Sequence, residues 1–559
     1  MFSQLGTVLL VAAAALLRLR RSFMVGDQSA YDDDSFDKPI PLPMPKFISC
    51  TNGTSPLPAA ALRFKVNIRC DIIDEAIQRY KKWMFAGGAH SALSTARRRP
   101  KRPPFQLLEI EIQSKICEFM PHLGMNENYE LDMFGNGSGA IRASSVWGAL
   151  RGLDSFSQLV VYSEEKQHSI RECTIRDGPR FQHRGIHLDT ARHFLPLGVI
   201  FETLDLMSQS KFNVFHWHMT DDESFPFQSQ AFPSLSEKGA YSPKHVYTPA
   251  DVQAVIEFAR LRGIRVVPEF DTPGHTLSWG RGQQDLLTRC YDKSGRYTGQ
   301  KALIDPTKQS SYDFLLAIFR EVLEVFPDES VHLGGDEAHF WFRQCWNKTT
   351  NPGIRQFMSL HNLTTPFQLE NFYMGMLLNV VLKKATASQK RRNYIVWQEV
   401  VDNNFTDKDL IAHVWKGFRN RTYIADALDR VTRKGHRTLF SSCWYLNYIK
   451  YGVDWKYFYQ CDPQDFNGTE AQKRLILGGE ACLWGEYVDA TNLTPRLWPR
   501  ASVVAEKLWS DASHTENATL AAPRLDQHRC LLVRRGFRAQ PLDGPGHCPV
   551  EFAYRYPVE

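Results

Sequence analysis

The sequence of 559 residues lacks several features that would place it in common classes of protein. Beyond residues 5–17, no apolar run approaches the roughly 20 residues that a membrane-spanning helix needs. No CxxC cluster offers ligands for structural zinc, and no repeat of about 20 to 50 residues is visible. The net charge is only +6, and no aromatic residues alternate with basic ones, which argues against nucleic-acid binding. We interpret the one dense basic run, 97–104, as a solvated loop, with a proteolytic processing site as the alternative.

The sequence does carry signs of the secretory route. The apolar run 5–17 is short for a membrane span and fits a signal peptide at residues 1–22. An uncleaved short anchor is the alternative, because the arginines of this region follow the run instead of preceding it. Eleven cysteines are then candidates for disulfides, and at least one must stay unpaired. Nine N-glycosylation sequons begin at Asn52, Asn136, Asn347, Asn362, Asn404, Asn420, Asn467, Asn492 and Asn517.

Eight short apolar runs indicate buried parallel strands. They lie at 184–190, 212–218, 264–271, 331–337, 394–399, 410–415, 438–445 and 477–484. Segments of helical period separate most of them, for example the segment that begins at Pro249, after the N-cap Thr248, and stops at Gly263. The helix after the fifth run is weak, because residues 400–410 are polar. Strands and helices alternating about eight times predict an α/β fold, the (β/α)8 TIM barrel.

The chain is too long for a barrel alone, so a second domain is expected before it. Segments 70–80 and 143–156 have helical patterns, whereas 105–112, 129–133 and 159–161 resemble strands, which predicts a small α+β domain. We place this domain at 38–180, the catalytic barrel at 181–530 and a C-terminal tail at 531–559. A disulfide between Cys530 and Cys548 would tie the tail to the barrel.

Two adjacent carboxylates, Asp336 and Glu337, end the fourth strand after two glycines. Active sites of this barrel lie at the carboxyl ends of the strands, and glycoside hydrolysis needs a carboxylic acid to protonate the leaving oxygen. Neighbouring residues on a strand point to opposite faces, so the pair need not be an acid facing a nucleophile. The nucleophile is then either a distant carboxylate or a group of the substrate. The plain alternative is a helix cap or a surface charge.

Aromatic and charged residues follow the other strands. Trp397, Trp415, Trp444 and Trp484 lie near the ends of strands five to eight. A single tryptophan would belong to the core, but four at corresponding ends favour an aromatic box around a sugar face or an acetyl group. Further polar residues fall just after strands, and they would form a charged rim that binds hydroxyl groups: Arg192, Asp221, Asp222, Glu269, Asp271, His275 and Glu486.

These segments carry a family resemblance. The chain resembles the lysosomal β-N-acetylhexosaminidases of glycoside hydrolase family 20 from about residue 62 to about residue 550. The matching segments are 147–158 (WGALRGLDSFSQ), 183–196 (HRGIHLDTARHFLP), 215–222 (FHWHMTDD), 259–276 (ARLRGIRVVPEFDTPGHT), 332–337 (HLGGDE), 396–400 (VWQEV), 444–447 (WYLN) and 478–489 (GGEACLWGEYVD).

The resemblance implies a retaining exo-glycosidase that removes terminal β-linked N-acetylglucosamine or N-acetylgalactosamine and uses the substrate's own acetamido oxygen as nucleophile. It assigns Glu337 as general acid and then base, and Asp336 as the group that stabilises the acetamido nitrogen. The remaining roles follow by matching positions: Tyr445 for the acetamido oxygen, Trp397, Trp415 and Trp484 for its methyl group, Arg192 and Glu486 for the outer hydroxyls, Asp221 and His275 for the polar network, and Asn447 for the C6 side.

The resemblance carries further expectations. It implies the disulfides Cys70–Cys117, Cys290–Cys345 and Cys530–Cys548, and a homodimer or heterodimer whose partner loops help to wall the pocket. It implies glycan substrates, no cofactor and a lysosomal location, with secretion as the alternative. The sequence departs from some members at Tyr448, where they have a basic residue that helps to bind negatively charged sugars. The resemblance therefore does not extend to sulfated or sialylated substrates.

Two other classes of function remain as alternatives. His216 and His218 form a His-x-His pair like that of some metal-dependent hydrolases, although it follows the second strand and no lysine ends the fourth. Otherwise both histidines sit in the barrel interior, hydrogen-bonded to neighbours. A sugar-binding barrel without activity is the second alternative, against which both Asp336 and Glu337 are present.

Overall fold

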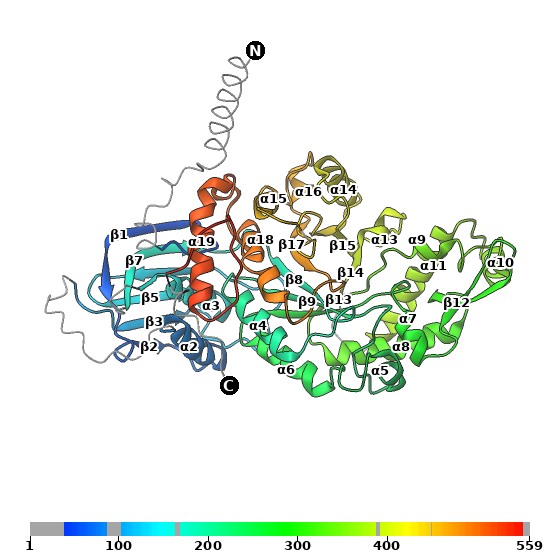
Figure 1. Cartoon of the computed structure of the whole chain (residues 1–559), viewed down its shortest axis with the longest axis horizontal. Coiled ribbons are helices and arrows are strands. Elements are labelled where there is room, and N and C mark those ends of the chain that lie inside the picture. The colour runs from blue at the N-terminus through cyan, green and yellow to red at the C-terminus, as the bar shows by residue number, and fades with distance from the viewer. Residues whose placement is uncertain are drawn as a thin grey trace, which may run out of the picture.

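The structure, a computed structural model, consists of a small sheet-containing domain beside a closed barrel (Figure 1). It describes residues 39–86, 102–162, 168–386, 392–448, 450–549 and 551. The predicted signal peptide and most of the basic run lie outside these ranges. In the described ranges, no helix is both long and apolar enough to cross a membrane.

The small domain is a mixed sheet covered by two helices. Its strands are β1 (Phe47–Pro56), β2 (Arg63–Val66), β3 (Leu107–Ile112), β4 (Tyr129–Met133), β5 (Ser138–Ala143), β6 (Val160–Tyr162) and β7 (His168–Asp177), and its helices are α2 (Asp71–Met84) and α3 (Val146–Gln158). The order is β1-β7-β4-β5-β3-β2, with β6 paired to β7. Both helices and the strands β3, β4 and β6 coincide with predicted segments, whereas β1, β2, β5 and β7 were not predicted. The domain is α+β, as expected.

Helix α3 is buried along its whole length, and its side chains make contacts that join the two domains. Its Arg151 donates to the backbone oxygen of Gly263 (3.0 Å), which precedes a barrel strand. The carboxylate of Glu127 lies between Arg151 (2.9 Å) and Arg184 of the first barrel strand (2.5 Å). A buried carboxylate shared by two guanidinium groups fixes the domains in one orientation, since breaking either pair would leave a buried charge uncompensated.

The barrel prediction is confirmed. Eight parallel strands close in the order β10-β13-β14-β15-β16-β17-β8-β9. They are β8 (His183–Asp189), β9 (Val214–Thr220), β10 (Arg265–Phe270), β13 (Ser330–His332), β14 (Asn393–Trp397), β15 (Ile411–Val414), β16 (Arg437–Phe440) and β17 (Ile476–Leu483). Each overlaps one of the eight apolar runs. All eight carboxyl ends therefore open on the same side of the molecule.

The helices around the barrel follow from local signals. Helix α6 begins at Pro249 because Thr248 and Asp251 form a capping box, and Gly263 beyond its end has a φ of +64°. As the polar sequence predicted, only the short α13 follows the fifth strand. The major helices are α4 (Leu197–Ser208), α6 (Pro249–Arg260), α8 (Gln309–Val325), α10 (Pro352–Leu360), α11 (Pro366–Met376), α14 (Arg421–Arg433), α18 (Arg500–Trp509) and α19 (Ala518–Arg534).

Shorter elements decorate the loops. They are α5 (Ser234–Gly239), α7 (Leu277–Gly282), the hairpin of β11 (Leu287–Tyr291) and β12 (Tyr297–Ile304), α9 (His339–Phe342), the π-helical turn η3 (Leu377–Leu382), α12 (Lys383–Ala385), α13 (Gln398–Asp402), α15 (Trp455–Tyr459), α16 (Glu470–Lys473), α17 (Leu493–Leu497) and the 3-10 turn η4 (Ala512–His514). The predicted boundary between barrel and tail at residue 530 falls inside α19.

Five disulfides fasten the described chain. Three are the pairs implied by the resemblance, Cys70–Cys117, Cys290–Cys345 and Cys530–Cys548. The other two, Cys50–Cys173 and Cys443–Cys461, could not be paired from spacing. Cys482 is buried and free, which accounts for the odd cysteine.

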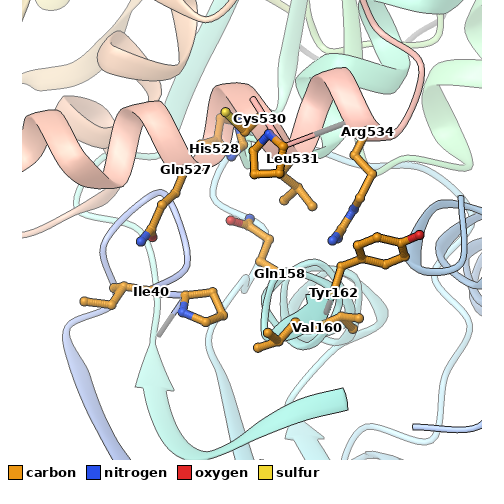
Figure 2. Close-up of a pocket in the computed structure, with 12 residues that line it drawn as sticks. Ile40, Gln158, Val160, Tyr162, Gln527, His528, Cys530, Leu531 and Arg534 are labelled. Carbon is orange, nitrogen blue, oxygen red and sulfur yellow. The ribbon is translucent and has the colours of Figure 1, made fainter. Parts of the chain in front are cut away.

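A cavity of about 110 Å³ lies where α19 packs against the small domain (Figure 2). Gln158, Val160 and Tyr162 line one side, and His528, Leu531 and Arg534 of α19 line the other. None of the predicted site residues borders this cavity, so it is a feature of the domain junction and not of the predicted site.

Candidate active site

The loop after β13 presents the two adjacent carboxylates. Three of its residues have left-handed backbone angles, Gly334 (φ +71°), Gly335 (+95°) and Glu337 (+53°). A Cβ on Gly334 would lie 1.6 Å from Oδ1 of Asp271, and one on Gly335 would lie 2.5 Å from a methyl of Val400. Both glycines are therefore required, and the strained conformation of Glu337 is typical of a functional loop.

The environments of the two carboxyl groups differ. Asp336 is 7% exposed, and among the described residues its Oδ1 has no hydrogen-bond partner. Glu337 is half-buried, and burial followed by repulsion from Asp336 raises its pKa. The pKa of the buried Asp271 is raised well above its usual value by burial and by Asp336, while its Oδ1 accepts from the backbone N–H of Gly335 (2.9 Å). Asp271 thus anchors the loop through Gly335, and both Asp271 and Glu337 keep a proton to a higher pH than an exposed carboxyl would.

A polar network lies beside Glu337. Nε2 of His275 is 3.7 Å from Oε2 of Glu337 and 3.9 Å from Oδ2 of Asp336. Its Nδ1 donates to Asp221 (3.0 Å), and Asp221 also binds Arg192 (2.8 Å). Burial lowers the pKa of His275, but Asp221 and Asp336 more than offset this, so the pKa is raised well above 6.5. The structure therefore brings the predicted residues Arg192, Asp221 and His275 together beside the two carboxyl groups.

Aromatic residues form the neighbouring wall. Trp397, Tyr445 and Trp484 are all at most 9% exposed and form one cluster, against which Trp415 packs. The rings of Trp397 and Trp484 are 6.0 Å apart, and those of Trp415 and Tyr445 stack at 6.1 Å. The structure therefore brings these four predicted residues together. The guanidinium of Arg192 lies 5.1 Å from the ring of Trp484, which joins the wall to the polar network.

The inclusion of Trp444 in the aromatic box was wrong. Its ring is fully buried in the main core against Phe440, and its Nε1 donates to the backbone oxygen of Phe458 (3.0 Å). The chain turns sharply after β16, so that adjacent residues point in opposite directions. Tyr445, not Trp444, faces the other aromatic residues.

The remaining predicted residues lie at the rim. Asn447 is half-buried, and its Oδ1 has no partner among the described residues. Glu486 is exposed near Arg192 and helps to raise the pKa of that guanidinium. Asp222 accepts from the backbone N–H of Leu277 (2.9 Å), which gives it a role in holding the loop. A hollow of about 520 Å³ opens beside Arg192.

Sequence reasoning missed two carboxylates of the site. Oδ2 of Asp189, at the end of β8, binds Arg192 (3.1 Å) and orients it. Glu399 accepts from Nε1 of Trp415 (2.8 Å) and pairs with Lys416 (3.0 Å). Burial and Asp336 raise the pKa of Glu399 to about 7. Both stand at the ends of predicted strands, and that position was the signal that could have found them.

Several His and Glu side chains inside the barrel have the spacing of a metal site. The groups are His187, His218 and Glu269; His216, Glu269 and His332; and His216, His413 and Glu480. Burial lowers the pKa of His216, yet Glu480 and Glu269 raise it to about 9. The pKa of His218 is likewise raised well above 6.5, by Glu269 and Asp221. Both histidines therefore pair with buried carboxylates in the barrel interior, His216 with Glu480 and His218 with Glu269.

Comparison with known proteins agrees with this geometry. The model of the glycosyl hydrolase family 20 catalytic domain matches residues 181–512, and a beta-acetyl hexosaminidase like model matches residues 41–159. Beta-hexosaminidase subunit alpha of Rattus norvegicus is 47% identical over 87% of this chain and 89% of its own length. Beta-hexosaminidase subunit beta of Homo sapiens is 48% identical over 86% and 83%.

A solved structure shares the architecture of both domains. The chitobiase of Flavobacterium johnsoniae superposes with a TM-score of 0.73 at 27% identity, over 89% of this chain and 72% of that one. The family model covers more than half of the chain, and the relatives match nearly all of it. With its barrel, its paired carboxylates and its aromatic wall, the chain belongs to glycosyl hydrolase family 20.

Proposed function

We propose that this protein is an exo-β-N-acetylhexosaminidase, which removes terminal non-reducing N-acetylglucosamine or N-acetylgalactosamine from glycans. The observation that carries the proposal is the aromatic wall of Trp397, Tyr445 and Trp484 directly beside Asp336 and Glu337. An apolar wall fits an acetyl methyl group, and an adjacent carboxylate fits the amide N–H next to it.

The chemistry divides between the two carboxyl groups. Glu337, with its raised pKa, protonates the glycosidic oxygen while the acetamido oxygen of the bound sugar attacks C1. The C1–O bond to the leaving group breaks, and a cyclic oxazolinium forms. Asp336 accepts a hydrogen bond from the acetamido N–H and stabilises the positive charge that develops on the acetamido nitrogen. Glu337 then removes a proton from water, which attacks C1 and reopens the ring with net retention. Because the nucleophile is part of the substrate, proximity replaces a second carboxylate.

The other residues hold the substrate. Tyr445 donates to the acetamido oxygen, and Trp397, Trp415 and Trp484 enclose the methyl group. Arg192 and Glu486 bind the outer hydroxyls, and Asn447 lies on the C6 side. The charged His275, anchored by Asp221, stabilises the ionised form of Glu337 after proton transfer. The pair of His275 and Asp221 therefore supports Glu337 when it acts as a base, after it has given up its proton as an acid.

The surface supports a secretory or lysosomal enzyme that assembles into dimers. None of the nine sequon asparagines is buried, so each is accessible to a glycan. Five disulfides suit an oxidising compartment. Exposed aromatic side chains Phe340, Tyr448, Tyr451 and Tyr487 follow strand ends around the site. Such residues are enriched in protein interfaces, which supports a homodimer or heterodimer whose partner helps to wall the pocket.

The test is hydrolysis of a chromogenic β-N-acetylglucosaminide beside the plain β-glucoside. Turnover of the N-acetyl sugar alone supports acetamido participation. Equal turnover of both sugars would mean that a protein carboxylate is the nucleophile, and the proposed mechanism would fail. The N-acetylgalactosaminide, assayed in parallel, reports the preference between the two sugars.

A further inference from the structure

Glu269 is a fully buried carboxylate inside the barrel, and its two oxygens reach two different parts of the site. Oε1 accepts a hydrogen bond from Nε1 of Trp397 (2.8 Å). Oε2 accepts from Nδ1 of His218 (2.6 Å) and lies 3.1 Å from Nε2 of His216. The carboxylate is 0% exposed, and burial raises its pKa, but His332 (3.0 Å from Oε1), His218 and His216 outweigh burial and hold the pKa well below its usual value.

His218 continues the chain of contacts toward the reacting groups. Its Nε2 donates to Oδ2 of Asp221 (2.9 Å), whose Oδ1 accepts from Nδ1 of His275 (3.0 Å). Nε2 of His275 stands 3.7 Å from Oε2 of Glu337. Carboxylate and imidazole groups thus alternate from Glu269 to His275 through charge-assisted hydrogen bonds, and His275 faces the general acid at an ion-pair distance of 3.7 Å.

Resting on the proposed function, we propose that Glu269 is a positioning residue. It fixes the aromatic wall and the polar network beside Glu337 relative to each other. One rigid carboxyl group orients the indole of Trp397 through one oxygen and, through the other, the line His218–Asp221–His275. Because its side chain is fully buried, its effect is exerted through these neighbours.

The barrel offers a matched control in Glu480. Glu480 is 1% exposed, and it binds Nε2 of His183 (2.6 Å) and Nδ1 of His216 (2.7 Å). As at Glu269, burial is outweighed by histidine partners, which hold the pKa of this buried carboxyl well below its usual value. Its hydrogen bonds reach neither Trp397 nor His218. Glu480 reaches Glu269 only through the shared His216, so removing its charge tests the cost of losing a buried ion pair while the hydrogen bonds of Glu269 to Trp397 and His218 stay in place.

The substitution Glu269→Gln should release either Trp397 or His218, for a geometric reason. Glutamine has one acceptor and one donor end, whereas Trp397 and His218 both donate, so one of the two hydrogen bonds must be lost. His218→Asn is more selective. Its amide still donates to Glu269 in place of Nδ1, but is too short to reach Asp221.

The pH profile supplies a readout that a merely structural role would not move. His218 is faced by Glu269, Asp221, Asp189 and the ring of His187. In the native protein the pKa of His218 is raised well above 6.5, so it stays charged in the working range. Without the Glu269 charge this pKa falls, and a new inflection enters the profile of kcat/KM.

The experiment uses the full-length protein with a chromogenic β-N-acetylglucosaminide. We expect Glu269→Gln to lower kcat by about 10- to 100-fold and to add the inflection. His218→Asn should lower kcat with KM within about twofold, because Trp397 keeps its anchor. Glu480→Gln should keep kcat within about threefold and add no inflection, while lowering Tm as much as Glu269→Gln does.

Equal kinetic losses in Glu269→Gln and Glu480→Gln, with unchanged pH profiles, would overturn the inference, since both would then be structural. If Glu269→Gln does not fold, His218→Asn decides. Unchanged kcat in that variant refutes the line of contacts. A folded but inactive native protein would instead refute the proposed function, so the two failures are distinguishable.

Discussion

Glu337→Gln separates proton donation from every other property of the site. Nε2 of His275 lies 3.7 Å from the carboxyl group of Glu337, which is half-buried. An isosteric amide at such a position should change the free energy of unfolding by no more than about 0.5 kcal/mol. It cannot supply the proton, and general-acid catalysis contributes about 10²- to 10⁴-fold. That corresponds to about 3 to 5 kcal/mol of transition-state stabilisation.

The assay compares two leaving groups. A β-N-acetylglucosaminide with an unactivated sugar leaving group needs the proton and should show the full loss, whereas an activated nitrophenyl group should show a smaller one. Native activity requires the protonated form of Glu337, because this residue is the general acid. Its pKa is raised, so activity should fall at a higher pH than the ordinary pKa of a glutamate would give. This alkaline descent should vanish in the variant. Glu223→Gln, which removes the charge of an exposed carboxylate that pairs with Arg192 (3.3 Å), is the control. Equal losses for both leaving groups, or a retained alkaline descent, would refute the assignment.

Four other outcomes are expected. Asp336→Asn should lower kcat by about 10²- to 10³-fold on N-acetyl sugars, and a loss below threefold would contradict its role. The pKa of His216 is about 9 when folded and 6.5 otherwise, so the associated stability of about 3 kcal/mol is present below pH 6.5 and lost as pH rises through 9; a flat Tm over that range would contradict this. A chelator should leave activity unchanged; loss that added metal restores would favour the metal alternative. Tyr448→Lys should raise the relative rate on a 6-sulfated N-acetyl sugar several-fold, and no change would place Tyr448 away from that side.

The strands and the main catalytic candidates were readable from sequence because they depend on local patterns. A buried parallel strand is a short apolar run, and all eight runs became barrel strands. The fold then fixed the side of the molecule on which the polar ends meet, and Asp336 and Glu337 followed. In the small domain, β1, β2 and β7 were missed because polar residues on their exposed or half-buried faces weaken the apolar pattern, and β5 was missed because its buried positions include glycine and alanine.

Side-chain direction could not be read from sequence. Trp444 and Tyr445 are neighbours, and only the turn after β16 decides that one enters the core and the other the aromatic wall. The pairing of Cys50 with Cys173 likewise depends on two strands separated by 123 residues that lie side by side.

The sequence by itself determined the barrel, the family and the chemical groups available, since periodicity and motif are properties of neighbouring residues. The tertiary structure alone decided how those groups act. Burial raises the pKa of Glu337 and of Asp271, and the carboxyl group of Asp271 anchors the catalytic loop at Gly335. Glu269 joins Trp397 to His218 across strands distant in sequence. Solvation and charge at these sites depend on which distant segments meet, and only the folded chain brings those segments together.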